Sequence, residues 1–327
     1  MMRSLAASVR VPLAWGTCYG LARTLIALGT AGTLAFSSSD SLFGLVSNRP
    51  KAPYCAGIQR FDAFCVTSSS HLDGVRWACV AALLVVASGW RPRWTCIPHW
   101  YVAASFYTSS SIPDGGDQVA SILTLLLVPV ALGDPRRWHW QRLSPPAGEA
   151  PSELRRWAIV GAACFTFAIQ LQVAGIYFQS SIAKLSHQEW ADGTAMYYWA
   201  SDPSFGASSW LAPVFRVLTD WGPTVTFLTW APIALEFALS ISLLMSRRAR
   251  LILLVGGFTL HLMIGLLMGL WSFVLVMWGA LLILCNPIGA SLPWRISRLK
   301  ASPAEENGAA DKGAMDTGDE RSTEVTV

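Results

Sequence analysis

The chain has 327 residues, of which 53% are hydrophobic and only 13% charged, and its formal net charge is +4. Soluble domains carry about 25% charged residues, so this composition excludes an ordinary soluble protein and indicates a multi-span helical membrane protein embedded in a lipid bilayer. We interpret the small positive net charge as an excess of Lys and Arg in the loops on one side of the membrane, which orients membrane helices. No nucleic-acid-binding surface is expected.

The first predicted span covers residues 13–36 and follows a short N-terminal segment, residues 1–12, that carries Arg3 and Arg10. No small-residue cleavage site precedes this run, so it predicts an anchor and not a removed signal peptide. Arg23 lies inside the span, where lipid would leave its charge unpaired. Two interpretations stay open for Arg23, a structural clamp between helices or a ligand for an anionic group.

A polar loop at residues 37–73 contains two cysteines, Cys55 and Cys65. If the loop lies outside the cytoplasm, an oxidised pair is permitted there, and we expect a disulfide between them. The other cysteines fall in or beside apolar runs and are typical of core packing. No C-x-x-C motif occurs, which argues against a thiol-disulfide oxidoreductase that uses a paired dithiol.

Three shorter helices are predicted next, at residues 75–90, 97–108 and 118–132. Because the last two are short for a full span, they are expected to be tilted, shielded by neighbours or broken around a cavity. His99 stands at the start of one helix, and it is either a helix-start histidine with satisfied hydrogen bonds or a catalytic residue. Asp114 opens the turn before the next helix and is a candidate cavity-lining residue.

The fifth predicted span, residues 157–180, follows a loop at 134–156 with five arginines, which is the strongest orientation signal in the chain. This span leads to Lys184, where the sequence turns polar and aromatic. A lysine at a helix end usually extends its stem along the lipid and keeps its ammonium in the interface. The alternative is that Lys184 faces a protected cavity and acts as a general base.

Residues 185–221 are rich in aromatic and turn residues, including Trp190, and predict a surface cap or lid. A sixth span at 223–245 contains Glu236, and the apolar run at 251–285, which contains His261, predicts a helical hairpin that turns near residues 269–272. Ionisable groups inside a membrane default to pairing or functional roles, so Arg23, Glu236 and His261 are expected to converge, with Arg23 and Glu236 as the most probable direct pair. Residues 295–327 are predicted to be a disordered cytoplasmic tail.

The sequence therefore predicts an all-α, polytopic transmembrane bundle of about eight helices, with its main domain at residues 13–294. Placing both termini in the cytoplasm puts the arginine-rich loops inside, as the positive-inside rule requires. The loop with Cys55 and Cys65, the Asp114 turn, Lys184 and the aromatic cap then lie on the outer face. The expected location is a cytoplasmic membrane.

The stretch Tyr177-Phe178 through Lys184-Leu185, followed by Trp190 and Gly193, resembles the signature of the HTTM membrane domain, the family that includes vitamin K-dependent gamma-carboxylase. Several other segments, among them LARTLIALGT, SGWRPRW, HWYVAASF, DGGDQVASILTLLLVP and EWADGTAMYYW, are similar to the sporulation-delaying protein B branch of this family. The likeness covers most of residues 13–286, and the Lys184 segment is its strongest motif.

This resemblance implies a membrane factor that matures a secreted, bacteriocin-like peptide toxin together with a small partner protein. In the carboxylase, the lysine of the matching Y-F-x5-K-L segment deprotonates a hydroquinone, which implies Lys184 as a catalytic base and, through a looser match, His99 as its partner. Arg23, Glu236, His261, Trp190 and Asp114 would line the cavity. The cofactor is unknown, with a quinone suggested by the resemblance alone, and no metal site is expected. The alternative is a non-enzymatic transporter or chaperone that holds the peptide for a partner enzyme.

Overall fold

The computed structural model describes residues 11–45, 52–66, 71–143, 152–202 and 206–292. Regular structure in these ranges is helical apart from an isolated β-bridge between Trp90 and Trp138, so the predicted all-α class is confirmed. The predicted tail at 295–327 and most of the segment at 1–12 lie outside the described residues.

Each predicted apolar run overlaps a helix, the run at 251–285 covers the two helices of the predicted hairpin, and the other boundaries shift by a few residues. The helices are α2 (Thr17–Phe36), α3 (Ser39–Phe43), η1 (Gly57–Phe61), α4 (Leu72–Ser88), α5 (Pro92–Ser109), α6 (Gly115–Leu132), α7 (Glu153–Leu185), α8 (Gln188–Ala191), α9 (Ala195–Ser201), α10 (Ala212–Thr219), α11 (Gly222–Ser240), η3 (Ser242–Leu244), α12 (Arg247–Met268) and α13 (Trp271–Cys285). The predicted hairpin turns at Gly269, whose φ of 72° is a left-handed conformation that glycine adopts without strain.

Short polar side chains set several helix starts. The hydroxyl of Ser152 accepts from the backbone N–H of Arg155 at the start of α7, and Ser246 does the same for α12. Asp114 and Asp117 form a reciprocal capping box at the start of α6, in which each carboxylate accepts from the other residue's N–H. Asp114 is thus a helix cap.

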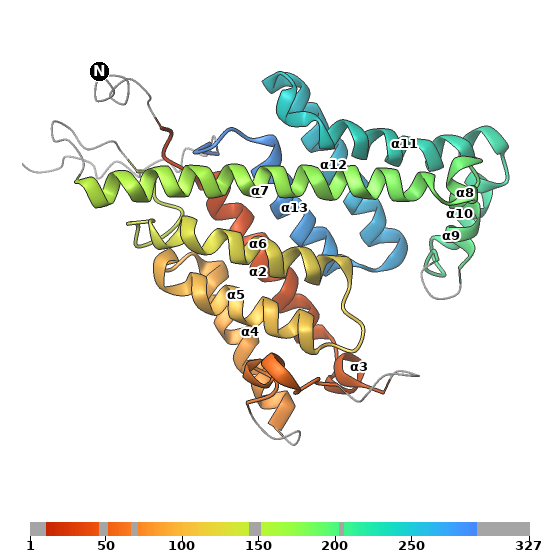
Figure 1. Ribbon diagram of the computed structural model, residues 1–327. Coiled ribbons are helices and arrows are strands. Elements are labelled where there is room, and N and C mark those ends of the chain that lie inside the picture. The colour runs from red at the N-terminus through yellow and green to blue at the C-terminus, as the bar shows by residue number, and fades with distance from the viewer. Residues whose placement is uncertain (1–10, 46–51, 67–70, 144–151, 203–205, 293–327) are drawn as a thin grey trace, which may run out of the picture. The chain divides into compact units, whose positions relative to one another are not determined.

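Helix α2 packs most extensively against α13, and small residues let the two backbones approach closely. A Cβ added to Gly29 of α2 would lie 2.6 Å from Val276, and one added to Gly279 of α13 would lie 2.8 Å from the carbonyl oxygen of Ala22. Figure 1 shows the long helix α7 crossing the bundle, with α4, α5 and α6 on one side and α11 and α12 on the other.

Among the described residues, three helices, α6, α7 and α12, are long and apolar enough to cross a membrane, and α13 is a shorter apolar helix. This is fewer than the eight predicted. Helix α4 is short for a span, because it has only 17 residues. Helices α2 and α11 are less apolar, because buried polar residues such as Arg23 and Glu236 lower their mean hydropathy. Large apolar side chains of α7 and α12, including Phe167, Leu171 and Ile252, remain exposed, as expected of a surface that faces lipid.

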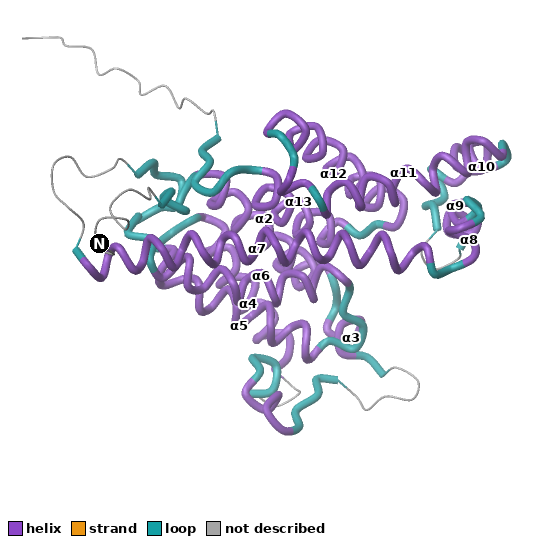
Figure 2. Tube along the Cα trace, turned by 45° about the horizontal axis from the view of Figure 1, so that its top comes forward, coloured by secondary structure: helices purple, strands orange, loops and turns teal. Residues whose placement is uncertain are grey.

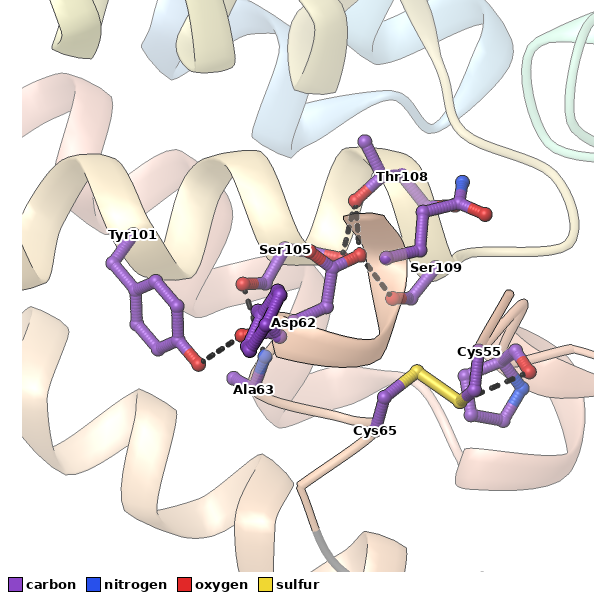
Figure 3. The surroundings of a disulfide bond; sticks show 11 residues. Cys55, Asp62, Ala63, Cys65, Tyr101, Ser105, Thr108 and Ser109 are labelled. Atoms are coloured by element: carbon purple, nitrogen blue, oxygen red, sulfur yellow. Dashed lines mark hydrogen bonds between the residues drawn. A yellow bond between two sulfur atoms is a disulfide. The ribbon is translucent and has the colours of Figure 1, made fainter. Parts of the chain in front are cut away.

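The polar loop between α3 and α4 is held by the predicted disulfide. Cys55 and Cys65 are bonded, and their Cα atoms lie 5.5 Å apart. Figure 3 shows the neighbouring contacts with α5, where the carboxylate of Asp62 accepts from the hydroxyls of Thr108 and Ser109. The disulfide prediction is confirmed.

Candidate functional site

The last turn of α7 presents a lysine to a carboxylate on α11. The ammonium of Lys184 donates to both oxygens of Glu236 at 2.7 and 2.6 Å, and to the hydroxyl of Ser180 at 2.7 Å. The side chain of Lys184 is 22% exposed and that of Glu236 is 8% exposed. This largely buried ion pair replaces the predicted Arg23–Glu236 pair, which is wrong.

A second polar pair lies beside the first. The hydroxyl of Tyr177, two turns before Lys184 on the same face of α7, lies 2.8 Å from Nε2 of His261 on α12. The His261 ring also meets Phe273 of α13 edge to face, with centroids 5.3 Å apart. Tyr177 and His261 are buried, and Nδ1 of His261 has no partner among the described residues.

The two pairs belong to one electrostatic cluster, because Glu236 acts on Tyr177 and Lys184 acts on His261. Four helical positions from α7, α11 and α12 therefore place a lysine, a carboxylate, a phenol and an imidazole together. In the sequence, Tyr177 stands out only as the start of the motif that contains Lys184. The seven-residue spacing between Tyr177 and Lys184 puts both side chains on one face of a helix, and this spacing is the sequence feature that indicates their proximity.

The predicted aromatic cap consists of short helices that gather at the end of α7 (Figures 1 and 2). Its Trp190 ring centroid lies 5.6 Å from the Lys184 ammonium, which fits a cation–π contact. A shallow hollow of about 490 Å³ in the cap is lined by Gln188, Glu189, Asp192, Thr194, Tyr198 and Trp199. The cap thus gives Lys184 an aromatic partner. It also forms a hollow with an acidic and aromatic lining, whose residues follow Lys184 closely in the sequence.

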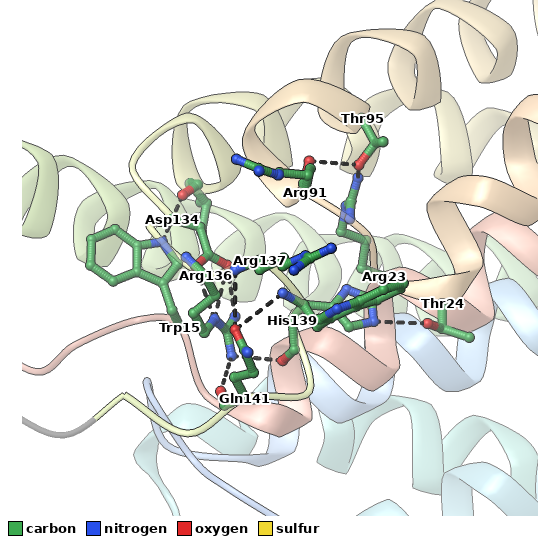
Figure 4. A network of polar contacts seen from close by, with 12 residues as sticks. Trp15, Arg23, Thr24, Arg91, Thr95, Asp134, Arg136, Arg137, His139 and Gln141 are labelled. Carbon is green, nitrogen blue, oxygen red and sulfur yellow. Dashed lines mark hydrogen bonds and ion pairs between the residues drawn. The ribbon is translucent and has the colours of Figure 1, made fainter.

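Arg23 belongs to a different cluster (Figure 4). Its Nη2 donates to the hydroxyl of Thr95 on α5 at 2.7 Å, and its side chain is completely buried. His99 lies one turn after Thr95 and is also buried, and Arg23 acts on it electrostatically. The expected convergence of Arg23 with Glu236 and His261 is therefore not found, since Glu236 and His261 lie in the Lys184 cluster.

A short loop after α6 closes the Arg23 cluster. Arg136 holds the carboxylate of Asp134 in a buried ion pair at 2.7 Å and donates to the carbonyl oxygen of His139. Nε2 of His139 lies 3.2 Å from the hydroxyl of Thr24, which itself donates to Ala87. The Thr24 hydrogen is used there, so His139 is the donor. Burial, together with Arg23 and Arg136, lowers the pKa of His139 to about 3, and the ring is neutral near pH 7.

The two clusters lie at opposite ends of α7. The loop at the Arg23 end passes close to the first turns of α7, because a Cβ on Gly133 would lie 3.4 Å from Ala158. Lys184 is roughly 40 Å further along the helix at 1.5 Å per residue. The charged partner of Lys184 is thus Glu236, and His99 is not the partner of Lys184.

A quinone would need an aromatic-sized cavity that reaches the Lys184 ammonium. The best-formed hollows of the described structure have other linings, one along α7 between Ala168 and Gln179, one around Tyr19 and Gln170, and the one in the cap. Lys184 lines none of these three hollows, so the steps proposed for Lys184 involve no quinone. Within the described ranges, no group of three or more His, Cys, Asp or Glu residues is arranged to hold a metal ion.

The described residues form an all-helical protein with several apolar helices and buried ionisable side chains, an arrangement compatible with a helical membrane protein. The chain is 34% identical over 287 residues to the uncharacterized protein YitO of Bacillus subtilis, covering 87% of this chain and 90% of that protein. It is also 32% identical over 276 residues to the sporulation-delaying protein SdpB of the same organism, covering 84% and 82%. The chain belongs to the family of these proteins.

No family model and no solved structure matches the chain. The expected likeness to sporulation-delaying protein B is thus confirmed, whereas the wider HTTM and carboxylase likeness stays a prediction from the sequence.

Proposed function

We propose that this protein is a multi-pass factor of the bacterial cytoplasmic membrane that matures a secreted peptide at the outer face, with Lys184 and Glu236 as its proton-handling pair. The family relation to SdpB supports a role in a sporulation-delaying peptide system. The observation that carries the site is the Lys184–Glu236 contact, because it joins the strongest sequence motif to a buried carboxylate from another helix.

The pair can exchange a proton without help from bulk water. Lys184 becomes a base only after its ammonium loses a proton, and the Glu236 carboxylate is in direct hydrogen-bond contact to take it. The neutral amine, with Trp190 beside it, then takes a proton from the substrate and becomes an ammonium again, while Glu236 releases its proton to water, so that the pair regains its starting state. Tyr177 and His261 support the pair from the buried side, where they can relay or hold a proton.

The cap offers a place for the peptide. Its hollow of about 490 Å³ falls in the range of ligand-binding clefts, and its acidic and aromatic lining suits a positively charged or aromatic segment. A small partner protein and a lipid bilayer complete the proposed system. Both termini are placed in the cytoplasm, because that puts the arginine-rich loops inside.

The test is mass spectrometry of the secreted peptide from cells with the wild-type protein, with Lys184→Met and without the protein. We expect a mass difference between the first and the last, and the unmodified mass with Lys184→Met when strains with equal amounts of membrane-inserted protein are compared. Lys184→Arg keeps the positive charge next to Glu236 but cannot serve as a base near pH 7, so it should also give the unmodified mass.

Two outcomes contradict the proposal. If Lys184→Met yields wild-type peptide, the lysine is not the base. If the peptide has one mass in all strains and only its secreted amount changes, the protein is a transporter or chaperone and the chemistry belongs to a partner.

A further inference from the structure

The Arg23 cluster contains buried polar atoms that lack partners. Arg23 makes one hydrogen bond, through Nη2 to Thr95, while its Nε and Nη1 have no partner among the described residues. Nε2 of His99 and the hydroxyl of Tyr19 are equally unpartnered, and all three side chains are buried. Buried polar groups are normally hydrogen-bonded, and leaving one unsatisfied is costly. Something absent from the protein chain is therefore expected to bind there.

The geometry brings these atoms together from two helices. Tyr19 and Arg23 are four residues apart on α2, and Thr95 and His99 are four residues apart on α5, so each pair shares one helix face. The hydrogen bond from Arg23 to Thr95 joins the two faces. Arg23 acts electrostatically on both Tyr19 and His99, so both side chains lie within electrostatic range of the same guanidinium.

The charges identify the kind of ligand. Asp134 is the carboxylate that acts on Arg23, but Arg136 holds both of its oxygens through Nε and Nη2. Asp134 and Arg136 thus cancel each other, and Thr95, His139 and Tyr19 bring no negative charge. Among the described residues, Arg23 is left as a buried cation without a carboxylate of its own, and such burial is costly unless an anion compensates it.

We propose that Arg23, His99 and Tyr19 form an enclosed binding site for a small monovalent anion between α2 and α5. The free N–H groups of Arg23 would supply the charge-assisted bonds, and the His99 and Tyr19 side chains would donate from the flanks. A halide, bicarbonate and a simple carboxylate share this chemistry. The site is separate from the Lys184 pair, so its test does not depend on the proposed function.

The test measures the thermal stability of the purified full-length protein in nanodiscs of a zwitterionic lipid. Sodium chloride, bicarbonate or formate is titrated against sodium gluconate, whose size excludes it from an enclosed site, at constant pH and ionic strength. A ligand that binds only the folded state stabilises it, and a tenfold excess over its Kd should raise the Tm by about 3 °C in a saturable manner. The anion with the strongest effect distinguishes halide from carboxylate-type ligands.

Arg23→Gln should abolish this dependence, and His99→Leu should weaken it at least threefold in apparent affinity. Arg76→Gln is the matched control, because Arg76 is also a buried arginine but its donors are taken by Asp73, Leu34 and Ser37. It should lower the Tm in every buffer and leave the anion dependence intact. If Arg23→Gln does not fold, calorimetric titration of the wild-type protein with the same three salts decides the matter.

The proposal is overturned if the wild-type Tm and the calorimetric heat are the same in all four salts, which would mean that water alone fills the site. It is equally overturned if folded Arg23→Gln keeps the full anion dependence.

Discussion

At the scale of single residues, the buried ionisable groups that the sequence predicts to converge fall into two separate sets. Lys184 meets Glu236 at one end of α7, and Arg23 lies with Thr95 and His99 near the other. A guanidinium is the better geometric match for a carboxylate, which is why Arg23 was the expected partner of Glu236. The fold gives Glu236 to the lysine instead, and this leaves the arginine without a counter-charge.

The Lys184–Glu236 pair can be tested by a double-mutant cycle. Lys184→Met and Glu236→Gln should each destabilise the protein, because each leaves a largely buried group without its partner, and the double variant should lose less than the sum. We expect a coupling energy of about 1 to 3 kcal/mol, from the unfolding of the four proteins in one detergent. Arg23→Leu with Glu236→Gln is the control pair, and its effects should add. Additive effects of Lys184→Met and Glu236→Gln would show that the contact contributes nothing.

His139 makes stability depend on pH. Its folded pKa of about 3 lies below the unfolded value of roughly 6.5, so its contribution is fully present above about pH 6.5 and is lost as the pH falls toward 3. Between pH 6.5 and 4.5 the wild-type protein should lose roughly 2 kcal/mol more of its free energy of unfolding than His139→Gln, as each pH unit is worth about 1.4 kcal/mol. His187→Gln, at an exposed position, should follow the wild type. Parallel curves for His139→Gln and wild type would refute this.

At the scale of elements, the contact between α2 and α13 depends on small residues. Gly29 lies against Val276 and the backbone of Ser272, whereas Gly32, one turn further along α2, faces open space with nothing within 4 Å of an added Cβ. The two glycines therefore form a matched pair within one helix.

Gly29→Ala should lower the stability by about 1 to 3 kcal/mol, because the new methyl group overpacks the helix contact. Gly32→Ala should raise it by up to about 1 kcal/mol, because alanine favours the helix over glycine and meets no neighbour. Thermal unfolding of both variants in one detergent tests the sign. A stabilised Gly29→Ala protein would mean that the two helices are not packed as closely as described.

At the scale of the whole molecule, the disulfide bears on the orientation that we propose for the protein in the membrane. Cys55 and Cys65 are oxidised, which is typical of a loop outside the cytoplasm, and the polar loop that contains them docks on the C-terminal end of α5. The arginine-rich loop that follows α6 contacts the other end of α5, through the hydrogen bond from Arg91 to the carbonyl oxygen of Arg137. The two loops therefore lie at opposite ends of α5, which agrees with the proposed orientation.

An impermeant maleimide added to intact cells should label Cys55 and Cys65 only after reduction. The double variant Cys55→Ser, Cys65→Ser should lose roughly 2 to 3 kcal/mol of stability, the chain-entropy value for a loop this short. Cys18, which is buried at the Arg23 end of α2, should stay unlabelled with or without reductant. Labelling of the two loop cysteines without reduction would exclude an external disulfide.

The sequence alone determined the helical class, the positions of the helices, the turn at Gly269 and the disulfide. These are local properties, since apolar runs, helix-capping residues, glycines and two cysteines in one loop act over a few residues. It also identified Lys184, Glu236, Arg23, His99 and His261 as ionisable groups that need partners. Which of them meet was decided only by the tertiary structure, because the pairing depends on how α2, α5, α7, α11 and α12 rotate and pack. The side-chain pattern of each helix shows which face is polar, and the packing of the bundle determines which polar faces come together.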